Sequence, residues 1–300
     1  MAVLQTYADG NRLEDVMRMV VTITPTDTPF MSGIQKKKAA NTLHQWPTET
    51  LTTRQDNAVV EGATFSYGTR TAPGREINVT QIFDKTFSVS STEGWVKGAG
   101  VDDMALHQKQ KAIKEISTDV EHALLRGSRA TGNASVARRL AGALNWVTTC
   151  ATAVVSGTKL TESFYCGLLE LAWAQGGKPD ETYTASMMKR VISSFTAGLT
   201  RNITADDKRL VNSVDVYESD FGIQKILLSR DILSGAQACA VLVIENAKWA
   251  MAVGEPIAEL PLAKVAQTLH GDNGVIRGEL TLECLAEPAN AKATGLENSF

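Results

Sequence analysis

The sequence predicts an α+β fold in which extended elements precede a compact α/β domain. Residues 39–90 carry few large aliphatic side chains, and one long helix with a thin apolar stripe is expected next, over 102–126. From about Leu160 onward, helix and strand patterns alternate over shorter distances. An isolated hairpin is marginal in water and a helix with one thin apolar face needs a surface to lie on, so other elements must support both.

The first 38 residues are predicted to contain little regular structure beyond one short helix. Apolar residues recur at helical spacing from Leu13 to Val20, which predicts a short amphipathic helix over 9–21. Pro25 and Pro29 then interrupt regular structure. We interpret the basic run that follows, Lys36-Lys37-Lys38, as a solvated surface.

Residues 39–90 are predicted to form a long two-stranded hairpin with a loose tip that contains glycine. On its far side Ile77 and Val79 alternate, as do Phe87 and Val89, and the pattern slips by one at Ile82-Phe83, as a β-bulge would cause. The alternative interpretation is a flexible insertion, although long structureless loops are uncommon in compact domains.

The helix predicted over 102–126 begins where Asp102 or Asp103 can cap free N–H groups, and it ends at Gly127. Charged residues cover most of its surface, so we expect it to lie across a sheet or an edge. The predicted apolar stripe consists of Ile113, Ile116, Val120 and Leu124, with Ala105, Ala112 and Ala123 beside them.

The second half of the chain is expected to be compact. A helix capped by Thr161 and ended by Gly176-Gly177 should contain Phe164, Leu168, Leu171 and Ala172. A second helix is predicted over 185–196, and the segment 288–300 is interpreted as a polar tail. Strands are predicted over 210–217, 223–228, 238–244 and 275–285.

Composition and charge exclude several classes of protein. The net charge of −3 gives no basic stripe of the kind that nucleic-acid readers use to neutralise phosphates. The sequence contains no stretch of about 18 apolar residues, so no membrane span is expected. The first residues lack a basic start followed by an apolar run, so we expect no secretory signal.

No familiar pattern of catalytic or metal-binding residues is present, and we predict no catalytic, cofactor-binding or metal-binding residues. The Gly98–Asp103 segment resembles a dinucleotide fingerprint only in part and is interpreted as a hinge and helix cap. The histidines form no HxH or HExxH pattern: His44, His107, His122 and His270. His107 and His122, fifteen residues apart on the predicted helix, are expected to lie on its surface. The cysteines form no close pair and are expected to be unpaired thiols: Cys150, Cys166, Cys239 and Cys284.

The order of these parts resembles the major capsid proteins of tailed phages, whose fold is shared with herpesvirus shells. The resemblance covers residues 20–145 well and is weak from 150 to 270. The matching segments are Asp27–Phe30, Lys36–Ala39 leading to Trp46, Val60–Gly62, Gln81–Phe83, Val89–Thr92 and Glu121–Gly127.

The resemblance implies a division of the chain into five parts. These are an N-terminal arm (1–38), an extended hairpin loop (39–90), a peripheral domain (91–150) with a spine helix (102–126), an axial domain (151–264), and a return strand of the peripheral domain with a C-terminal tail (265–300).

The function implied is a coat protein that assembles into pentamers and hexamers, forming an icosahedral shell around double-stranded DNA without sequence-specific contacts. Scaffolding, portal and decoration proteins are possible partners, no membrane is implied, and assembly is expected in the host bacterial cytoplasm. The alternatives are the shell of an encapsulin-like compartment and a soluble α/β enzyme with an unrecognised site in residues 150–270.

Overall fold

The structure is a computed structural model that describes residues 24–65, 67–70, 72–96, 103–195, 215–232, 234–235, 238–260 and 271–299. The chain divides into two compact units. The first comprises residues 1–26, 84–116 and 258–277, and the second comprises 27–83, 117–257 and 278–300. The helix predicted over 9–21, and residues 102, 196 and 210–214 of other predicted elements, lie outside the described residues.

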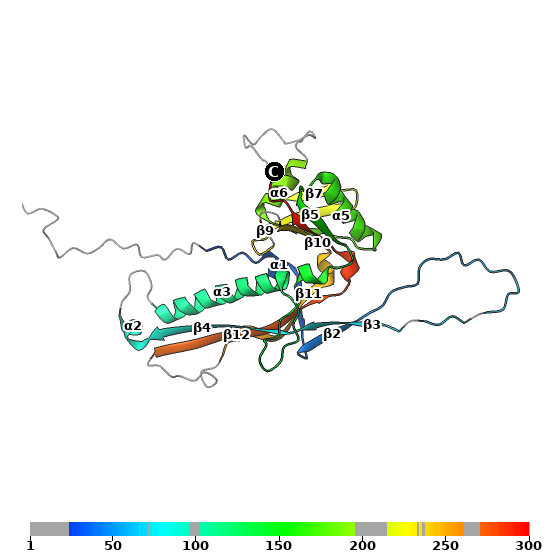
Figure 1. Ribbon diagram of the computed structural model, residues 1–300. Helices are drawn as coiled ribbons and strands as arrows, with labels where there is room; N and C mark the ends of the chain where they lie inside the picture. The colour runs from blue at the N-terminus through cyan, green and yellow to red at the C-terminus, as the bar shows by residue number, and fades with distance from the viewer. Residues whose placement is uncertain are drawn as a thin grey trace, which may run out of the picture. The chain divides into compact units, whose positions relative to one another are not determined.

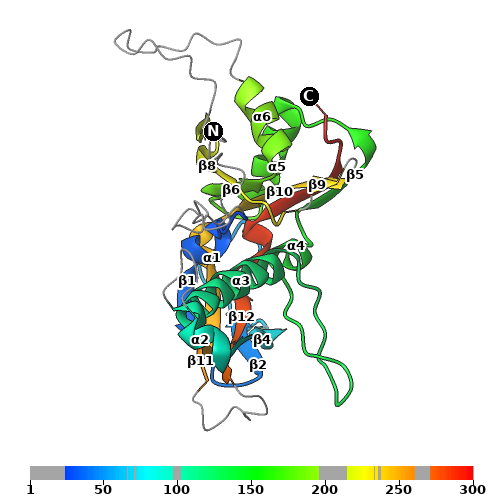
Figure 2. The same ribbon diagram turned by 90° about the vertical axis from the view of Figure 1, so that its left-hand side faces the viewer.

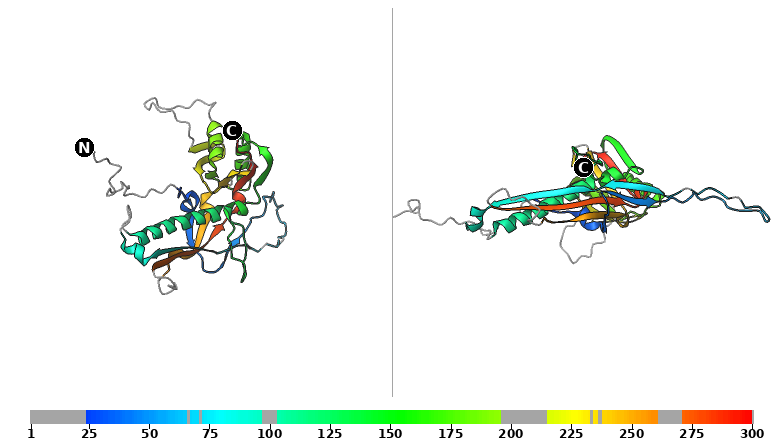
Figure 3. Two further views of the ribbon diagram at one scale, coloured as in Figure 1. Left: turned by 60° about the vertical axis from the view of Figure 1, so that its left-hand side comes forward. Right: turned by 90° about the horizontal axis from the view of Figure 1, so that it is seen from below.

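One sheet has four strands in the order β1-β11-β12-β4. β1 pairs in parallel with β11, with Gln35 opposite Ala250, and Figure 3 shows β4 and β12 running side by side. The strands are β1 (Gln35–Lys38), β4 (Gln81–Ser90), β11 (Trp249–Glu259) and β12 (Gly271–Cys284).

The long helix α3 (Met104–Arg126) confirms the predicted spine helix, and Figure 1 shows it as one continuous element. The Asp103 carboxylate accepts a hydrogen bond from the Leu106 N–H at 3.0 Å, as expected of a helix cap. The chain leaves the helix at Gly127, as predicted. A Cβ there would lie 2.5 Å from the Ala123 carbonyl oxygen, so this position requires glycine.

The second sheet has seven strands, and its main path is β5-β13-β10-β6-β8-β7, with β9 paired to β10. Figure 2 shows α5 (Glu162–Ala174) and α6 (Ser186–Phe195) on the same side of this sheet. The strands are β5 (Ala151–Thr158), β6 (Glu181–Thr184), β7 (Val216–Ser219), β8 (Gly222–Leu228), β9 (Ser234–Gly235), β10 (Ala238–Ile244) and β13 (Ala291–Leu296).

A hydrophobic core of the second unit lies between these helices and the seven-stranded sheet. Apolar side chains at i, i+3 and i+4 positions of α5 and α6 meet those of β10 and β13. The Thr161 hydroxyl caps α5 by accepting a hydrogen bond from the Phe164 N–H, as predicted. The core includes Tyr165, Leu168, Leu169, Met188, Ile192, Val241, Val243, Ala291 and Ala293.

A third, two-stranded sheet joins β2 (Leu43–Thr48) to β3 (Gly74–Val79) in antiparallel register, with Leu43 opposite Val79. The described residues between them form no helix or strand. Short helices complete the fold: α1 (Pro29–Gly33), α2 (Ser91–Trp95), α4 (Ala143–Trp146), and the 3-10 helices η3 (Asn246–Lys248) and η5 (Glu287–Ala289).

Several predicted elements differ from the structure. The far side of the hairpin is shorter than predicted, because β4 belongs to the four-stranded sheet rather than to the ribbon. The supposed polar tail contains β13, which lies between β5 and β10 and buries Ala291, Ala293 and Leu296 completely. The basic run forms a strand, β1. The strands β5 and β11 were not predicted from the sequence.

Candidate assembly surfaces

The segment between β2 and β3 exposes large apolar side chains that have no contact with a core. Its order is local: the Ala63 N–H donates to the Val60 carbonyl oxygen at 3.1 Å, and the Ala58 N–H donates to Asp56 Oδ1 at 3.2 Å. Monomeric soluble proteins rarely expose several large apolar side chains together, so this segment is a candidate interaction surface. The exposed fractions are 93% for Leu51, 82% for Val60, 91% for Phe65 and 97% for Tyr67.

The base of this ribbon, in contrast, is firmly attached. The buried Trp46 indole donates from Nε1 to the Cys284 carbonyl oxygen at 2.9 Å, and its ring lies 5.4 Å from that of Trp146. The buried Asn78 amide donates to the carbonyl oxygens of Ala141 and Leu282 at 3.1 and 2.7 Å. The base of the ribbon therefore has a fixed position within the second unit.

A buried carboxylate connects β1 and β2 to β12. Glu283 accepts from Lys37 Nζ at 2.8 Å and lies 3.0 Å from His44 Nε2. Burial acts to raise the pKa of Glu283, but the hydrogen bonds from Lys37 and His44 outweigh it and lower that pKa below its ordinary value. Lys37 is exposed like Lys36 and Lys38, as predicted, and in addition its Nζ reaches this buried carboxylate.

A second buried carboxylate attaches the chain after the arm to α3. Glu121 accepts from the Phe30 N–H at 2.9 Å and from the Met31 N–H at 2.7 Å. The Phe30 ring is buried at this junction, edge-on to Tyr183 at 5.4 Å and to Trp249 at 6.1 Å. Burial raises the pKa of Glu121 to about 7, despite the two N–H donors that favour its charged form.

The apolar stripe of α3 is covered only in part. Ile116, Val120 and Leu124 are fully buried, as predicted, but Ile113 is 42% exposed and Leu106 is 50% exposed. At about 100° per residue, Ile113 falls between Val120 and Leu124 on the helix circumference, and Leu106 coincides with Leu124. Ile113 therefore lies on the predicted stripe, but its side chain, like that of Leu106, is only partly buried.

The residues singled out for chemistry do not converge. His44 contacts Glu283, His107 is half-buried, His122 is exposed, and His270 lies outside the described residues. The cysteines are unpaired as predicted, with Cys166 half-buried and the other three buried. Within the described ranges, no three His, Cys, Asp or Glu side chains cluster as metal ligands would, and no helix is long and apolar enough to span a membrane.

Neither Glu121 nor Glu283 was singled out from the sequence. Each acts through a partner far away in the chain: Phe30 is 91 residues from Glu121, and Lys37 is 246 residues from Glu283. A local signal exists only for Glu283, which lies in a mainly apolar strand, because an ionised group is rarely buried there without a partner.

Comparisons with known proteins agree with this arrangement. The family model described as SU10 major capsid protein matches residues 3–297. A major capsid protein of Escherichia phage Phieco32 is 34% identical over 126 residues, which are 42% of this chain and 36% of the relative. This match therefore covers only about a third of that relative's length.

Solved structures share the fold over nearly the whole chain. A structure from Gordonia phage Cozz has a TM-score of 0.64 at 10% identity and covers 98% of both chains. The capsid structure of Cyanophage P-SCSP1u has a TM-score of 0.61 at 11% identity, covering 94% of this chain and 92% of that one. An encapsulin complex from Synechococcus elongatus has a TM-score of 0.61 at 10% identity, covering 100% and 98%. The fold is thus that of phage capsids and of an encapsulin, and the match to the family model shows that the chain belongs to the SU10 major capsid protein family.

Proposed function

We propose that this chain, as a member of a major capsid protein family, builds the shell of a tailed phage. The observation that carries the proposal is the exposed apolar segment between β2 and β3, joined to an anchored ribbon. Such a segment gains buried area only from another molecule, and in a closed shell that molecule is a second copy of the chain.

In this proposal the five predicted parts have different mechanical roles. The axial domain (151–264) joins copies into pentamers and hexamers, and the peripheral domain (91–150, with the return strand in 265–300) joins these capsomers. The extended hairpin loop (39–90) lies over the spine helix of a neighbour, where the exposed stripe around Leu106 is a suitable receptor. The arm (1–38) is held at its end by the Phe30 and Glu121 contact.

The shell encloses packaged double-stranded DNA, is assembled in the host cytoplasm and becomes part of the virion. Scaffolding, portal and decoration proteins are the partners that such a shell recruits. We expect the chain to act mechanically and to have no catalytic activity.

An encapsulin-like compartment is the second candidate, because an encapsulin shares the fold at a TM-score of 0.61. The family match favours the phage shell. The content of the purified particle separates the two candidates, since a phage shell packages a genome and an encapsulin does not.

The experiment that tests the proposal is electron microscopy of the purified full-length chain, alone and under crowding, with sedimentation velocity on the same samples. Rings, capsomers or closed shells are expected. A chain that stays strictly monomeric in both conditions, and also when it is expressed with the neighbouring genes of its phage, would contradict a role in a shell.

A further inference from the structure

The loop that follows α3 concentrates positive charge in a chain whose net charge is negative. Between Glu121 and Glu162 the sequence contains no Asp or Glu, but it contains one Lys, Lys159, and four Arg. The four Arg lie at the end of α3 and in the loop after it: Arg126, Arg129, Arg138 and Arg139.

The base of this loop is fixed by contacts within the second unit. Ala130 and Arg139 form an antiparallel bridge through two backbone hydrogen bonds of 3.0 Å each. The Arg138 guanidinium donates to Glu279 at 2.9 Å, and the Ala141 N–H donates to the buried Asn78 side chain at 2.9 Å. Of the Arg side chains in the loop, Arg138 therefore has a structural partner.

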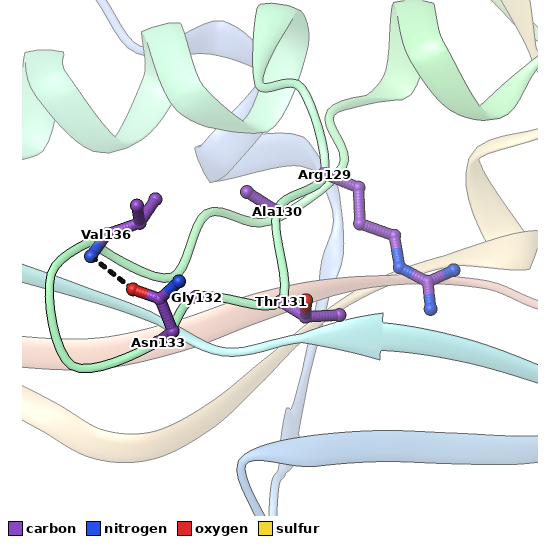
Figure 4. A pocket seen from close by; sticks show the side chains of 6 residues that line it. All are labelled: Arg129, Ala130, Thr131, Gly132, Asn133 and Val136. Carbon is purple, nitrogen blue, oxygen red and sulfur yellow. Dashed lines mark hydrogen bonds between the residues drawn. The ribbon is translucent and has the colours of Figure 1, made fainter.

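The tip of the loop is a defined turn rather than a loose connection. The Asn133 Oδ1 accepts from the N–H groups of Ser135 and Val136 at 2.8 Å each, and Figure 4 shows the bond to Val136. Gly132 has a φ of +73°, and a Cβ there would lie 2.6 Å from the Arg138 Cγ, so only glycine fits. The turn holds the two sides of the loop close together.

Two guanidinium groups at the base of this loop point into solvent. Arg129 and Arg139 are exposed, and neither forms an ion pair or a side-chain hydrogen bond with the described residues. Figure 4 shows the Arg129 side chain extending away from Asn133 and Val136 at the tip. Guanidinium groups held by a fixed backbone are suited to bind phosphate oxygens.

The chemistry of the tip argues for a nucleic-acid backbone rather than a protein partner. Protein interfaces use buried aromatic and aliphatic anchors, whereas here Val136 is the one large apolar side chain among the exposed residues of the tip. Hydroxyl, amide and backbone N–H groups from small residues, together with Arg, make up most contacts to DNA phosphates.

We propose that the loop of residues 127–142 is a contact site for the phosphate backbone of double-stranded DNA, with Arg129 and Arg139 as the binding residues. This inference rests on the proposed shell function, because that function supplies the DNA. Binding is independent of sequence and depends on salt, as expected when cations are released from phosphates.

The test uses unassembled full-length subunits and short double-stranded DNA of random sequence, with the binding constant measured by fluorescence anisotropy at several salt concentrations. In Arg129→Gln/Arg139→Gln, the slope of log K against log salt should fall by about 2, because each phosphate contact contributes about 0.9. The matched control is Lys36→Gln/Lys38→Gln, which removes two exposed charges from β1 and should leave the slope unchanged.

The variant Arg129→Lys/Arg139→Lys keeps the charge and should restore the slope, because a phosphate accepts Lys as a point charge. Thermal melting of all variants checks that the subunits are folded. An unchanged slope in the Gln variant, or an equal fall in the β1 control, would overturn the proposal. Gln variants that bind DNA normally but do not assemble would instead assign the loop to contact with another copy.

Failure of this inference and failure of the shell function are distinguishable. If wild-type subunits form shells but have the same slope of log K against log salt as Arg129→Gln/Arg139→Gln, only the DNA contact is refuted. Subunits that never assemble would refute the shell, whatever the DNA measurement gives.

Discussion

Two parts of the second unit have opposite relations to solvent. The segment between β2 and β3 exposes Leu51, Phe65 and Tyr67 almost completely. The seven-stranded sheet buries even the small side chains of Ala291 and Ala293. Apolar area buried within the subunit stabilises its own fold, whereas apolar area left exposed can stabilise only an assembly. The two parts should therefore respond differently to similar changes.

The largest expected effect comes from removing the exposed segment. Replacing Leu51–Ala72 with an Asn-Gly turn should leave a folded subunit that melts cooperatively, because the segment contributes almost nothing to the subunit core. The same change should abolish closed shells, because each neighbour loses a long contact. Electron microscopy and thermal melting of the variant measure the two effects.

Point variants make this comparison sharper. Phe65→Ala/Tyr67→Ala removes two exposed aromatic rings, and Thr64→Ala/Thr69→Ala is the matched control on neighbouring exposed positions. Only the aromatic variant should reduce shell formation. Normal particles from the shortened chain would show that the segment does not connect subunits, and an unfolded shortened chain would show that it belongs to the core.

The next effect compares one residue type in both parts. Leu169→Ala in α5 removes a fully buried side chain and should lower the free energy of unfolding by about 2–5 kcal/mol. Leu51→Ala should change the same quantity by less than about 0.5 kcal/mol, because Leu51 is exposed. Denaturant unfolding of unassembled subunits measures both, and equal losses would mean that Leu51 packs in the subunit.

The elements that could be predicted from the sequence are those whose pattern is local. The spine helix and β10 follow from apolar periodicity and from the composition of short segments, and the glycine after Arg126 marks the end of the helix in the sequence. The strand β13 could not be predicted in this way. Its sequence, Ala291–Leu296, has little apolar volume, and it is buried because β5 and β10 pair with it on both sides.

Charge was informative in two places. The run Lys36–Lys38 indicated a solvated surface, and its three lysines are exposed, although the strand they form was not predicted. This strand, β1, lies at the edge of its sheet, where lysines are a common protection against pairing with other chains. The absence of acidic residues between Glu121 and Glu162 is visible in the sequence and marks the basic loop. Which of its arginines are exposed depends on Glu279, a partner distant in the chain.

The junction at Glu121 should give a moderate effect that depends on pH. Burial raises the pKa of the Glu121 carboxyl from 4.5 to about 7 in the folded state. The stabilisation of the fold by its protonated form is complete below pH 4.5, the pKa in the unfolded chain, and is lost as the pH rises through 7. The full shift corresponds to about 3 kcal/mol, since one pKa unit equals about 1.4 kcal/mol.

The measurement is the difference in free energy of unfolding between the wild-type subunit and Glu121→Gln, taken at pH 5 and at pH 8. The contributions of other titrating groups cancel in this difference. The wild-type subunit should therefore be more stable, relative to the variant, at pH 5 than at pH 8. A difference that does not change with pH would show that the pKa of Glu121 is not raised.

The smallest expected effect on stability is that of adding a reductant, which should affect neither the exposed segment nor the seven-stranded sheet. The four thiols are unpaired, and burial raises the pKa of Cys284 to about 12, with smaller rises for Cys150 and Cys239. A thiol with a raised pKa contains little thiolate and reacts slowly.

Because the thiols are unpaired, dithiothreitol should leave the melting temperature of subunits and shells unchanged. A thiol reagent should label the half-buried Cys166 first, because the other three thiols are buried. Mass spectrometry of the labelled native subunit checks the order of labelling. A clear loss of stability with dithiothreitol, in samples freed of metal, would show that a disulfide contributes to the fold or to the shell.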